Sequence, residues 1–579
     1  MGIVVLLIKK MYFCRRKCDK ALLQVTRLQL RVDKVLHPDV NHVNLSTRSL
    51  VNLKTYKLKN SRRMEYPIGI QDFEELRKNR CVYVDKTDLI YKLVEEGKYY
   101  FLSRPRRFGK SLLISTLEVY FRGRKEFFEG LKIMELETEW AEYPVLHLDL
   151  NTKKYENKSS LEAILNMHLE IWESEYGDEK KDRSSEERFM YVIRNAFEKT
   201  GKQVVILVDE YDKPLLQAIG NEALQDDYRN TLKAFYGALK SMDRYIKFAL
   251  LTGVTKFGKV SVFSDLNNLR DISMLKAYES ICGITEEELY SVFEEDIRAL
   301  GKANNMTEEE TKAELKEKYD GYHFNEECVD IYNPFSILNT FANRKFDRYW
   351  FATGTPTFLV ELMKSCKYDL KKLTNEYASV DSLSGLETIK KDPVSILYQS
   401  GYLTIKGYDR EFGIYSLGFP NKEVEEGFVE SLLPNYTGMN NSESKFEIMN
   451  FVREIRTGDT DAFMKRLQSF FADTPYELVR DLELHYQNVM FILFKLLGFY
   501  TQAEYHTSEG RIDMVVKTHD YIYVMEFKLD GTAEEAMQQI ESKDYPLPFE
   551  CDGRKLVKLG VNFSNEKRNV ERWVVSINF

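Results

Sequence analysis

Four apolar runs, at 98–103, 145–150, 204–208 and 246–252, alternate with stretches of helical periodicity between residues 64 and 285. The run at 204–208 is continuously apolar, which is typical of a strand buried on both faces of a sheet. Strands that alternate with helices at such intervals are joined by crossover connections, and these place neighbouring strands parallel. The pattern therefore predicts an α/β domain built on a parallel sheet.

Beyond residue 285 the pattern becomes helical and rich in aromatic residues. Residues 394–418 predict a helix followed by two short strands, at 402–406 and 414–417, an arrangement similar to a winged helix. The aromatic clusters could stack on nucleic-acid bases, although core and interface packing is their commoner use. We expect this middle region to extend from 286 to 439.

A polar stretch rich in Asn and Ser at 440–444 predicts the last domain boundary. After it we expect a helix over 483–497, three strands at 500–505, 512–516 and 521–527, and a helix over 534–542. The chain is thus divided into an N-terminal extension, 1–63, and three domains, 64–285, 286–439 and 440–579.

Charge separates the N-terminal extension from the rest of the chain. Residues 1–63 contain 15 Lys or Arg and 3 Asp or Glu, a net charge of +12, whereas the remainder carries 68 against 88, or −20. We expect the extension to be poorly ordered, or to lie upstream of a natural start at Met64; a basic arm for nucleic acid or membrane is the alternative. No apolar run approaches transmembrane length, and the 7 scattered cysteines form no disulfide framework, so we expect a cytoplasmic protein without a membrane partner.

Ser103 to Ser111 form a candidate phosphate-binding loop, because a predicted strand precedes Gly109-Lys110-Ser111 and a helix follows. In that setting backbone N–H groups face an anion, Lys110 neutralises the outer phosphates of ATP, and the Ser111 hydroxyl ligates Mg²⁺. Arg104 stands where the usual pattern has glycine. A strained residue costs about 1–3 kcal/mol, less than several charge-assisted hydrogen bonds contribute. The alternative without a binding role is a basic turn that caps a helix.

Two acidic residues, Asp209 and Glu210, follow the apolar run at 204–208. At the carboxyl end of such a strand Asp209 can hold Mg²⁺ through water, and Glu210 can orient the attacking water. The run at 246–252 ends near the same edge, where Thr252 or Thr255 could sense the γ-phosphate, or each could be a turn residue. Arg270 is a candidate arginine finger, but a solvated surface position is the simpler interpretation.

The stretches 67–73, 83–87, 103–111, 209–215 and 263–269 together resemble the AAA-ATPase-like family, which is typically fused to a C-terminal PD-(D/E)XK nuclease domain, mostly in bacteria and archaea. The resemblance implies a three-layer α/β P-loop domain built on a parallel sheet. In that family the loop commonly lacks its first glycine as well. The residues expected at the nucleotide are Arg104, Arg107, Gly109, Lys110, Ser111, Asp209 and Thr252.

A second group of charged residues lies on the predicted C-terminal strands. Glu526 and Lys528 are two apart, so both side chains emerge on one face of a strand while Phe527 points to the other. Asp513 on the neighbouring strand completes a carboxylate pair able to hold a divalent metal, and Lys528 can stabilise charge that develops on a phosphate. The alternative is a cross-strand salt bridge on an exposed face.

The helix before these strands and the helix after them resemble a PD-(D/E)XK domain, with a restriction-endonuclease-like α/β fold. This resemblance implies that Asp513, Glu526 and Lys528 occupy catalytic positions, that Glu483 is an acidic metal-binding position of the first helix, and that Gln539 is the helix glutamine. The expected function is that of an ATP-regulated, Mg²⁺- or Mn²⁺-dependent nuclease acting on nucleic acid, with DNA favoured, in genome defence or mobile-element biology.

Other functions are left open by these patterns. A nucleotide-switched DNA-binding or scaffold protein with an inactive nuclease domain is the first alternative. A helicase or translocase ranks below it, because no second set of helicase motifs is present. A homo-oligomer is compatible with the sequence. The net charge of −20 after residue 63 argues against strong sequence-independent DNA binding, so any nucleic-acid contact must be local.

Overall fold

The computed structural model describes residues 65–151, 154–177, 182–256, 262–263, 268–353, 357–384, 393–472, 482–498, 502–505, 513–549, 552–564 and 566–578. The predicted N-terminal extension, 1–63, lies outside these residues. Residues 65–579 form one compact unit. No helix among the described residues is long and apolar enough to cross a bilayer.

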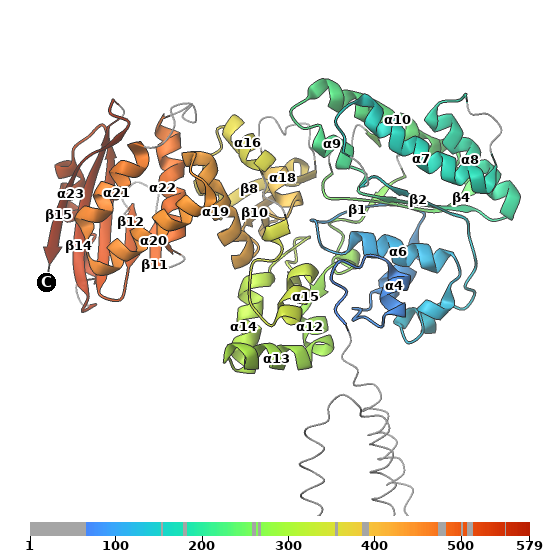
Figure 1. Cartoon of the computed structure of the whole chain (residues 1–579), viewed down its shortest axis with the longest axis horizontal. Helices are drawn as coiled ribbons and strands as arrows, with labels where there is room; N and C mark the ends of the chain where they lie inside the picture. Colours follow the sequence, from blue (N-terminus) through green and yellow to red (C-terminus); the bar gives the residue numbers. More distant parts are fainter. Residues whose placement is uncertain are drawn as a thin grey trace, which may run out of the picture. The chain divides into compact units, whose positions relative to one another are not determined.

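A parallel sheet organises the first part of this unit. Its strands lie in the order β2-β3-β4-β1-β5, with bounds β1 (Tyr99–Ser103), β2 (Val145–Asp149), β3 (Val204–Asp209), β4 (Ile246–Gly253) and β5 (Arg270–Asp271). The first four coincide with the predicted strands. β3 is buried throughout because helices cover both faces of the sheet. On one face lie α7 (Lys158–Tyr176), α8 (Ser185–Thr200) and α10 (Glu222–Ser241), and on the other α4 (Phe73–Lys78) and α6 (Lys110–Phe121) (Figure 1).

The strand order brings three strand ends together. β4 lies between β1 and β3, with Leu102 paired to Thr252 on one side and Val208 paired to Leu251 on the other. All these pairings are parallel, so the carboxyl ends of the three strands share one edge of the sheet. That edge carries the loop after β1, the acidic residues after β3 and the threonines at the end of β4.

The middle region is helical, and it begins where Thr285 caps α12 in a capping box with Glu288. Its helices of six or more residues in the described part of the chain are α12 (Glu286–Val292), α13 (Glu294–Asn304), α14 (Glu308–Tyr319), α15 (Pro334–Asn343), α16 (Thr357–Ser365), α18 (Val394–Gln399) and α19 (Lys422–Thr437). The expected helix and hairpin are present as α18, β9 (Thr404–Asp409) and β10 (Ile414–Gly418). A third strand not expected from the sequence, β8 (Glu376–Ser379), pairs with β10.

A buried carboxylate connects three parts of this region. Glu423, in the first turn of α19, is 2% exposed; its carboxylate accepts hydrogen bonds from the backbone N–H of Trp350 and from the hydroxyl of Ser336, both at 2.7 Å. Burial raises the pKa of Glu423 to about 7, even though these hydrogen bonds favour the charged form. The folded protein therefore holds a proton on Glu423 more tightly than an unfolded chain, where the pKa is about 4.3.

We expect Glu423→Gln to reduce the pH dependence of stability. The stability that this carboxyl contributes is full below its unfolded pKa and is lost as the pH rises through about 7. Between pH 5 and pH 8 the wild type should lose about 2 kcal/mol more than the variant, which keeps the shape but cannot ionise. Urea unfolding of both proteins at the two pH values measures this difference. Parallel pH profiles would contradict it.

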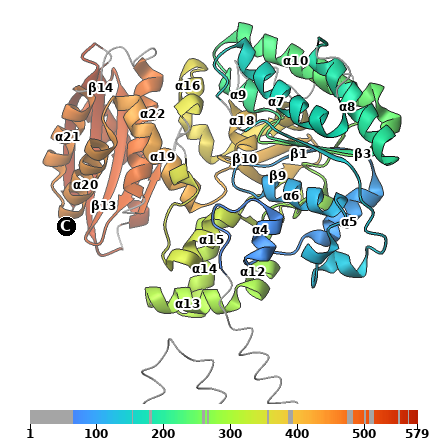
Figure 2. The same ribbon diagram turned by 45° about the vertical axis from the view of Figure 1, so that its right-hand side comes forward.

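A mixed sheet organises the C-terminal part. Its strands, β11 (Gln502–Tyr505), β12 (Met514–Lys517), β13 (Tyr521–Leu529), β14 (Lys555–Ser564) and β15 (Asn569–Asn578), lie in sequence order, and only β13 and β14 pair parallel. The crossover helix between these two is α23 (Ala533–Ser542). Helices α20 (Asn441–Thr457), α21 (Thr460–Ala472) and α22 (Leu482–Gly498) lie over the other face (Figure 2). The expected strands match β11 to β13, whereas β14 and β15 were not anticipated.

Candidate functional site

The loop after β1 leads directly into the N-terminus of α6. Gly109 precedes the helix with φ of +94°, a conformation that glycine adopts without strain. No side chain caps the helix, and its first turn contains no acidic residue. Its first N–H groups and the positive end of the helix dipole therefore favour an anion at this position, beside Lys110 and Ser111.

Lys110 is 4% exposed, and its ammonium points back across the loop. Nζ donates hydrogen bonds to the carbonyl oxygens of Arg104 (3.1 Å) and Pro105 (3.3 Å), and it lies 3.3 Å from Oε1 of Glu210. The ammonium thus occupies the space between the loop and the carboxylates after β3. A phosphate bound at the start of α6 would meet this charge.

The two predicted carboxylates lie opposite the loop. Asp209 is buried and accepts a hydrogen bond from the hydroxyl of Thr252 at 2.7 Å. Glu210 adopts a φ of +56°, a conformation that is strained for a residue with a side chain. The structure therefore brings Lys110, Asp209, Glu210 and Thr252 to one edge of the sheet, with the Thr252 hydroxyl directed at Asp209.

Thr255 has a different partner. Its N–H and hydroxyl both donate to Asp212, at 2.6 and 2.7 Å. Burial, followed by the charge of Glu210, raises the pKa of Asp212 to about 6, and the bonds from Thr255 act in the opposite direction. Arg270 lies in β5, 3.6 Å from Glu96, with a largely exposed side chain. This position agrees with the simpler interpretation of Arg270 as a surface residue.

Arg104, a predicted nucleotide contact, uses its side chain for hydrogen bonds inside the protein. Its side chain is 1% exposed, and its guanidinium donates to the carbonyl oxygens of Ser103, Ser273, Tyr278 and Glu279. The same group lies 3.9 Å from the ring centre of Phe324. Arg104 also does not take up the positive φ considered for it; that conformation occurs at Arg107 and Gly109. The physical reason is that loop carbonyls left unpaired at the edge of the sheet need a buried donor.

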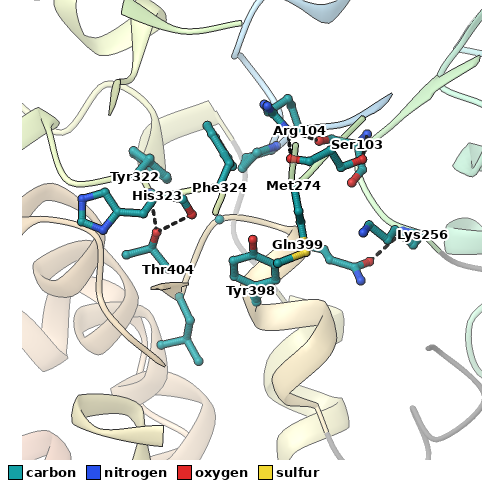
Figure 3. Close-up of a pocket in the computed structure, with 14 residues that line it drawn as sticks. Ser103, Arg104, Lys256, Met274, Tyr322, His323, Phe324, Tyr398, Gln399 and Thr404 are labelled. Carbon is teal, nitrogen blue, oxygen red and sulfur yellow. Dashed lines mark hydrogen bonds between the residues drawn. The ribbon is translucent and has the colours of Figure 1, made fainter. Parts of the chain in front are cut away.

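The cavity beside Arg104 is not a nucleotide site either. Figure 3 shows Arg104 and Ser103 on one side of it and Phe324, Tyr398 and Thr404 from the middle region on the other. Its volume is about 20 Å³, enough for a water molecule and far too small for a nucleotide. It is a small gap at the contact between the loop and the middle region.

We expect Arg104→Ala to destabilise the protein by at least about 3 kcal/mol, because several buried carbonyls would lose their donor. Arg107→Ala should change stability by less than about 1 kcal/mol, since this side chain is exposed and contacts only the Phe335 ring face among the interactions described. Thermal unfolding monitored by fluorescence compares the two. If Arg104→Ala kept normal stability but lost ATP binding, Arg104 would contact the nucleotide, as the sequence predicts.

The remainder of the loop contacts the middle region. The Arg106 carbonyl accepts from the indole N–H of Trp350 at 3.0 Å, and its guanidinium donates to the Tyr402 hydroxyl at 3.2 Å. Phe108 packs edge-on against Tyr322, with ring centres 4.8 Å apart. A Cβ on Gly401 would lie 2.8 Å from Pro105, so this glycine permits close approach. No sequence motif indicated these contacts, because they join segments more than 200 residues apart.

Gly109 lines a second cavity, of about 100 Å³. It is mostly apolar and is lined by residues of the loop and α6, of the segment before β1, and of the turn before α12, among them Tyr83, Leu112 and Cys282. Its position beside the start of α6 suits the base of a nucleotide. The sequence contained a signal for it in the stretches 67–73 and 83–87, which supply Pro67, Tyr83 and Lys86 to the lining, but no spacing within them indicated a binding site.

In the C-terminal sheet Asp513 and Glu526 are neighbours. Met514 pairs with Met525, so the residues just outside this pair, Asp513 and Glu526, face each other across the two strands. Asp513 accepts a hydrogen bond from the N–H of Phe527 at 2.9 Å. Burial, with the nearby charge of Asp513, raises the pKa of Glu526 to about 7, whereas the charge of Lys528 opposes the rise.

Gln539 of α23 forms hydrogen bonds with both Glu526 and Lys528. Its amide Nε2 donates to Glu526, and its Oε1 accepts from Nζ of Lys528, which lies 3.6 Å from Glu526. Phe527 points to the opposite face, where it packs on Phe494 of α22. The expected separation of Glu526 and Lys528 from Phe527 is therefore confirmed.

A divalent metal fits the donor set at this position. Oε2 of Glu526 is buried and has no hydrogen-bond partner, a costly state that a cation would relieve. Asp513 and Glu526 supply two hard oxygen ligands, and Mg²⁺ usually takes only one or two carboxylates from a protein. No cluster of three or more His, Cys, Asp or Glu suited to a metal occurs in the described parts of the chain. Glu483 is the second residue of α22, but its side chain is outside the description.

Comparison with known proteins identifies two domain families in the chain. Residues 67–263 match the family model described as predicted AAA-ATPase, and residues 481–573 match the PD-(D/E)XK nuclease superfamily. A protein of Azotobacter chroococcum mcd 1, described as "Uncharacterized protein in vnfD 5'region", is 35% identical over 530 residues, which cover 89% of this chain and 99% of that protein. The chain belongs to the AAA-ATPase-like family with a C-terminal PD-(D/E)XK nuclease superfamily domain.

The AAA-ATPase-like match contains the loop after β1 and the carboxylates after β3, and the PD-(D/E)XK match contains Asp513, Glu526, Lys528 and Gln539. Two solved structures from Aeropyrum pernix also show similarity. ORC2, in ADPNP–ADP complexes, is 9% identical with a TM-score of 0.23, covering 64% of this chain and 97% of its own. ORC1 in complex with DNA is 12% identical with a TM-score of 0.22, covering 60% and 92%. Such low scores support no functional conclusion.

Proposed function

We propose that the chain is an ATP-binding, metal-dependent nuclease of nucleic-acid phosphodiesters whose cleavage is regulated by the nucleotide. The observation that carries this proposal is the arrangement of Asp513, Glu526 and Lys528 around Gln539. It places two carboxylates and one cation at a single position, and phosphodiester hydrolysis needs a metal site beside a positive charge.

In the nucleotide half, Lys110 would hold the outer phosphates at the start of α6. Ser111 and Asp209 would hold Mg²⁺, which neutralises charge on the phosphates when bound. Thr252 orients the carboxylate of Asp209 through its hydrogen bond, and Glu210 would orient the attacking water. The exposed Arg107 would add a second positive charge from the loop.

In the nuclease half, Asp513 and Glu526 would hold Mg²⁺ or Mn²⁺, which polarises the scissile phosphate and activates water when bound. Lys528 would stabilise negative charge that develops on the phosphate. Gln539 keeps Glu526 and Lys528 apart at a defined separation, because its two amide atoms bond one to each.

Regulation is supported by a chain of contacts between the two halves. Arg106 of the loop binds Trp350, whose backbone N–H binds Glu423 at the start of α19. In the same turn of α19, Glu425 pairs with Lys495 of α22 at 2.7 Å. A change in the loop on ATP binding would therefore act on a helix that packs directly on the nuclease domain.

Contact with nucleic acid can be local, as the negative overall charge requires. A groove of about 1100 Å³ lies along α19 and α20, and its lining includes three exposed cationic residues of α20, Lys445, Arg453 and Arg456. Apolar residues such as Met449 lie between them. This combination of cations and apolar surface suits a nucleic-acid strand.

A matched cleavage assay tests the proposal. The full chain is incubated with single- and double-stranded DNA and RNA, in Mg²⁺ or Mn²⁺, with and without ATP. We expect metal-dependent cleavage of at least one substrate and a change in its rate when ATP is added. Cleavage under none of these conditions would instead favour the nucleotide-switched DNA-binding or scaffold protein, and equal rates with and without ATP would remove the regulatory part.

A further inference from the structure

The groove along α19 and α20 is separated from the candidate metal site by the nuclease sheet. The Tyr523 hydroxyl, on β13, donates to the carbonyl of Ile455 in α20 at 2.7 Å, so α20 covers the face to which Tyr523 points. Tyr523 precedes Glu526 by three positions on the same strand, and the two side chains therefore emerge on opposite faces. Residues 264–480, which include α20, also lie outside both family matches.

The two carboxylates that line the groove each have a cation of their own. Glu430 of α19 pairs with Arg348 at 2.8 Å, and Asp347 pairs with Lys345 at 2.6 Å. The cations on α20 are not needed to neutralise these acids. The groove is therefore complementary to an anion, although the chain as a whole is negatively charged.

The cations of α20 are distributed along the helix. Lys445, Arg453 and Arg456 are exposed, and the last two follow Lys445 by 8 and 11 residues, which is about 12 and 17 Å along the axis. Lys445 and Arg453 pair with no carboxylate in the part of the chain that the structure describes. A nucleic-acid strand, with a phosphate at each nucleotide, can contact several of these charges at once, whereas one small anion cannot.

An exposed aromatic ring lies among these charges. Phe446, directly after Lys445, is 58% exposed, and its ring contacts no other aromatic ring or cation among the described residues. Met449, which is 54% exposed, and Arg453 follow Phe446 by three and seven residues, so apolar and cationic side chains share one face of α20. An aromatic ring in such a place can stack on a nucleic-acid base. A single strand leaves the flat faces of its bases open, but a duplex covers them.

We propose that this groove binds a single-stranded segment of the nucleic-acid substrate, with Phe446 stacked on an unpaired base and with Lys445 and Arg453 at its phosphates. The inference rests on the proposed action on nucleic acid and adds a binding site separate from the metal site. A strand held at both places binds more tightly than one held at the metal site alone, because the second contact is intramolecular.

Binding measured in EDTA isolates the groove, since the metal site needs a divalent cation. The full chain is titrated with a fluorescent 20-nucleotide DNA strand, with the RNA strand of the same sequence and with the DNA duplex. Phe446→Ala should weaken binding of the preferred single strand about tenfold and of the duplex less than about twofold. Phe446→Trp should keep the affinity. Phe412→Ala, which removes a similarly exposed ring outside the groove, should leave it unchanged.

Lys445→Met tests the phosphate contact, because it keeps the aliphatic stem and removes the charge. We expect weaker single-strand binding and a slope of log Kd against log salt that is smaller by about 0.7, as the loss of one phosphate contact on a single strand requires. Lys465→Met, at an exposed position of α21 outside the groove, is the matched control. In cleavage assays with Mg²⁺, Phe446→Ala should raise KM for the single strand about tenfold, a larger effect than any on kcat.

Unchanged single-strand affinity in both Phe446→Ala and Lys445→Met, while wild type binds and cleaves, would overturn the inference and leave the nuclease proposal intact. An equal loss in Phe412→Ala, or an equal loss for the duplex in Phe446→Ala, would also overturn it, as would a wild type that binds neither single strand. Wild type that binds a single strand through Phe446 but cleaves nothing would overturn the nuclease function and keep the groove. Melting temperatures within about 2 °C of wild type exclude misfolding as the cause of weaker binding.

Discussion

Lys110→Ala is expected to weaken ATP binding at least about 100-fold, because the variant loses the cation at the outer phosphates and leaves Glu210 without its partner. An uncompensated carboxylate beside the phosphates adds repulsion to the lost attraction. Glu210→Gln should bind ATP as well as wild type, or better, and lose hydrolysis. Calorimetry with ATP and phosphate-release kinetics measure the two effects separately.

Lys98→Ala provides the control for this experiment. Lys98 directly precedes β1, at the end of the strand opposite the loop, and it pairs with Asp243 at 2.8 Å. Its replacement should leave ATP affinity unchanged. If Lys110→Ala bound ATP with wild-type affinity, the loop would be a basic turn that begins a helix, and the nucleotide site would have to lie elsewhere.

The second large effect is expected in the nuclease domain. Asp513→Ala and Glu526→Gln should each lower Mn²⁺ affinity and reduce cleavage at least about 100-fold, since a hard cation would keep only one carboxylate. Lys528→Ala should keep metal affinity and lower the cleavage rate, because its charge acts mainly in the transition state. Gln539→Ala should cost about 10- to 100-fold in activity, as is usual for a residue that orients metal ligands.

A structural salt bridge predicts a different outcome for the same variants. Each substitution would then leave metal binding untouched and change stability alone, through the loss of one partner of a buried pair. Titration of Mn²⁺ into Asp513→Ala separates the two interpretations. Wild-type affinity in this variant would rule out the site formed by Asp513 and Glu526.

The local pattern of hydrophobic and polar residues was sufficient to predict most of the strands that position these sites. The strands at β1 to β4 were predictable because continuous apolar runs in a parallel sheet leave few alternatives. The strand period placed Glu526 and Lys528 on one face and Phe527 on the other. β14 and β15 were harder to predict from the sequence, since charged residues such as Lys558 and Arg572 interrupt them and no motif marks their ends.

The features that could not be predicted depend on contacts between distant segments. Arg104 occupies a position where the family motif suggests phosphate chemistry, and only the carbonyls of residues 273–279 show that its charge is used inside the protein. The Asp212–Thr255 pair likewise needed the register of β3 and β4.

The bond between Arg106 and Trp350 spans 244 residues, and this separation affects how the protein is made. A ribosome adds about 5–20 residues per second, so the phosphate loop emerges about 10–50 s before the indole that bonds to it. During that interval the nascent chain has the P-loop motif without the contacts that hold residues 105–108 in place. We expect a chain released at residue 290 to be cleaved rapidly by trypsin after Arg106 or Arg107, whereas the full chain resists. The protein would therefore acquire a rigid nucleotide site only after Trp350 has emerged, and before its nuclease domain is synthesised.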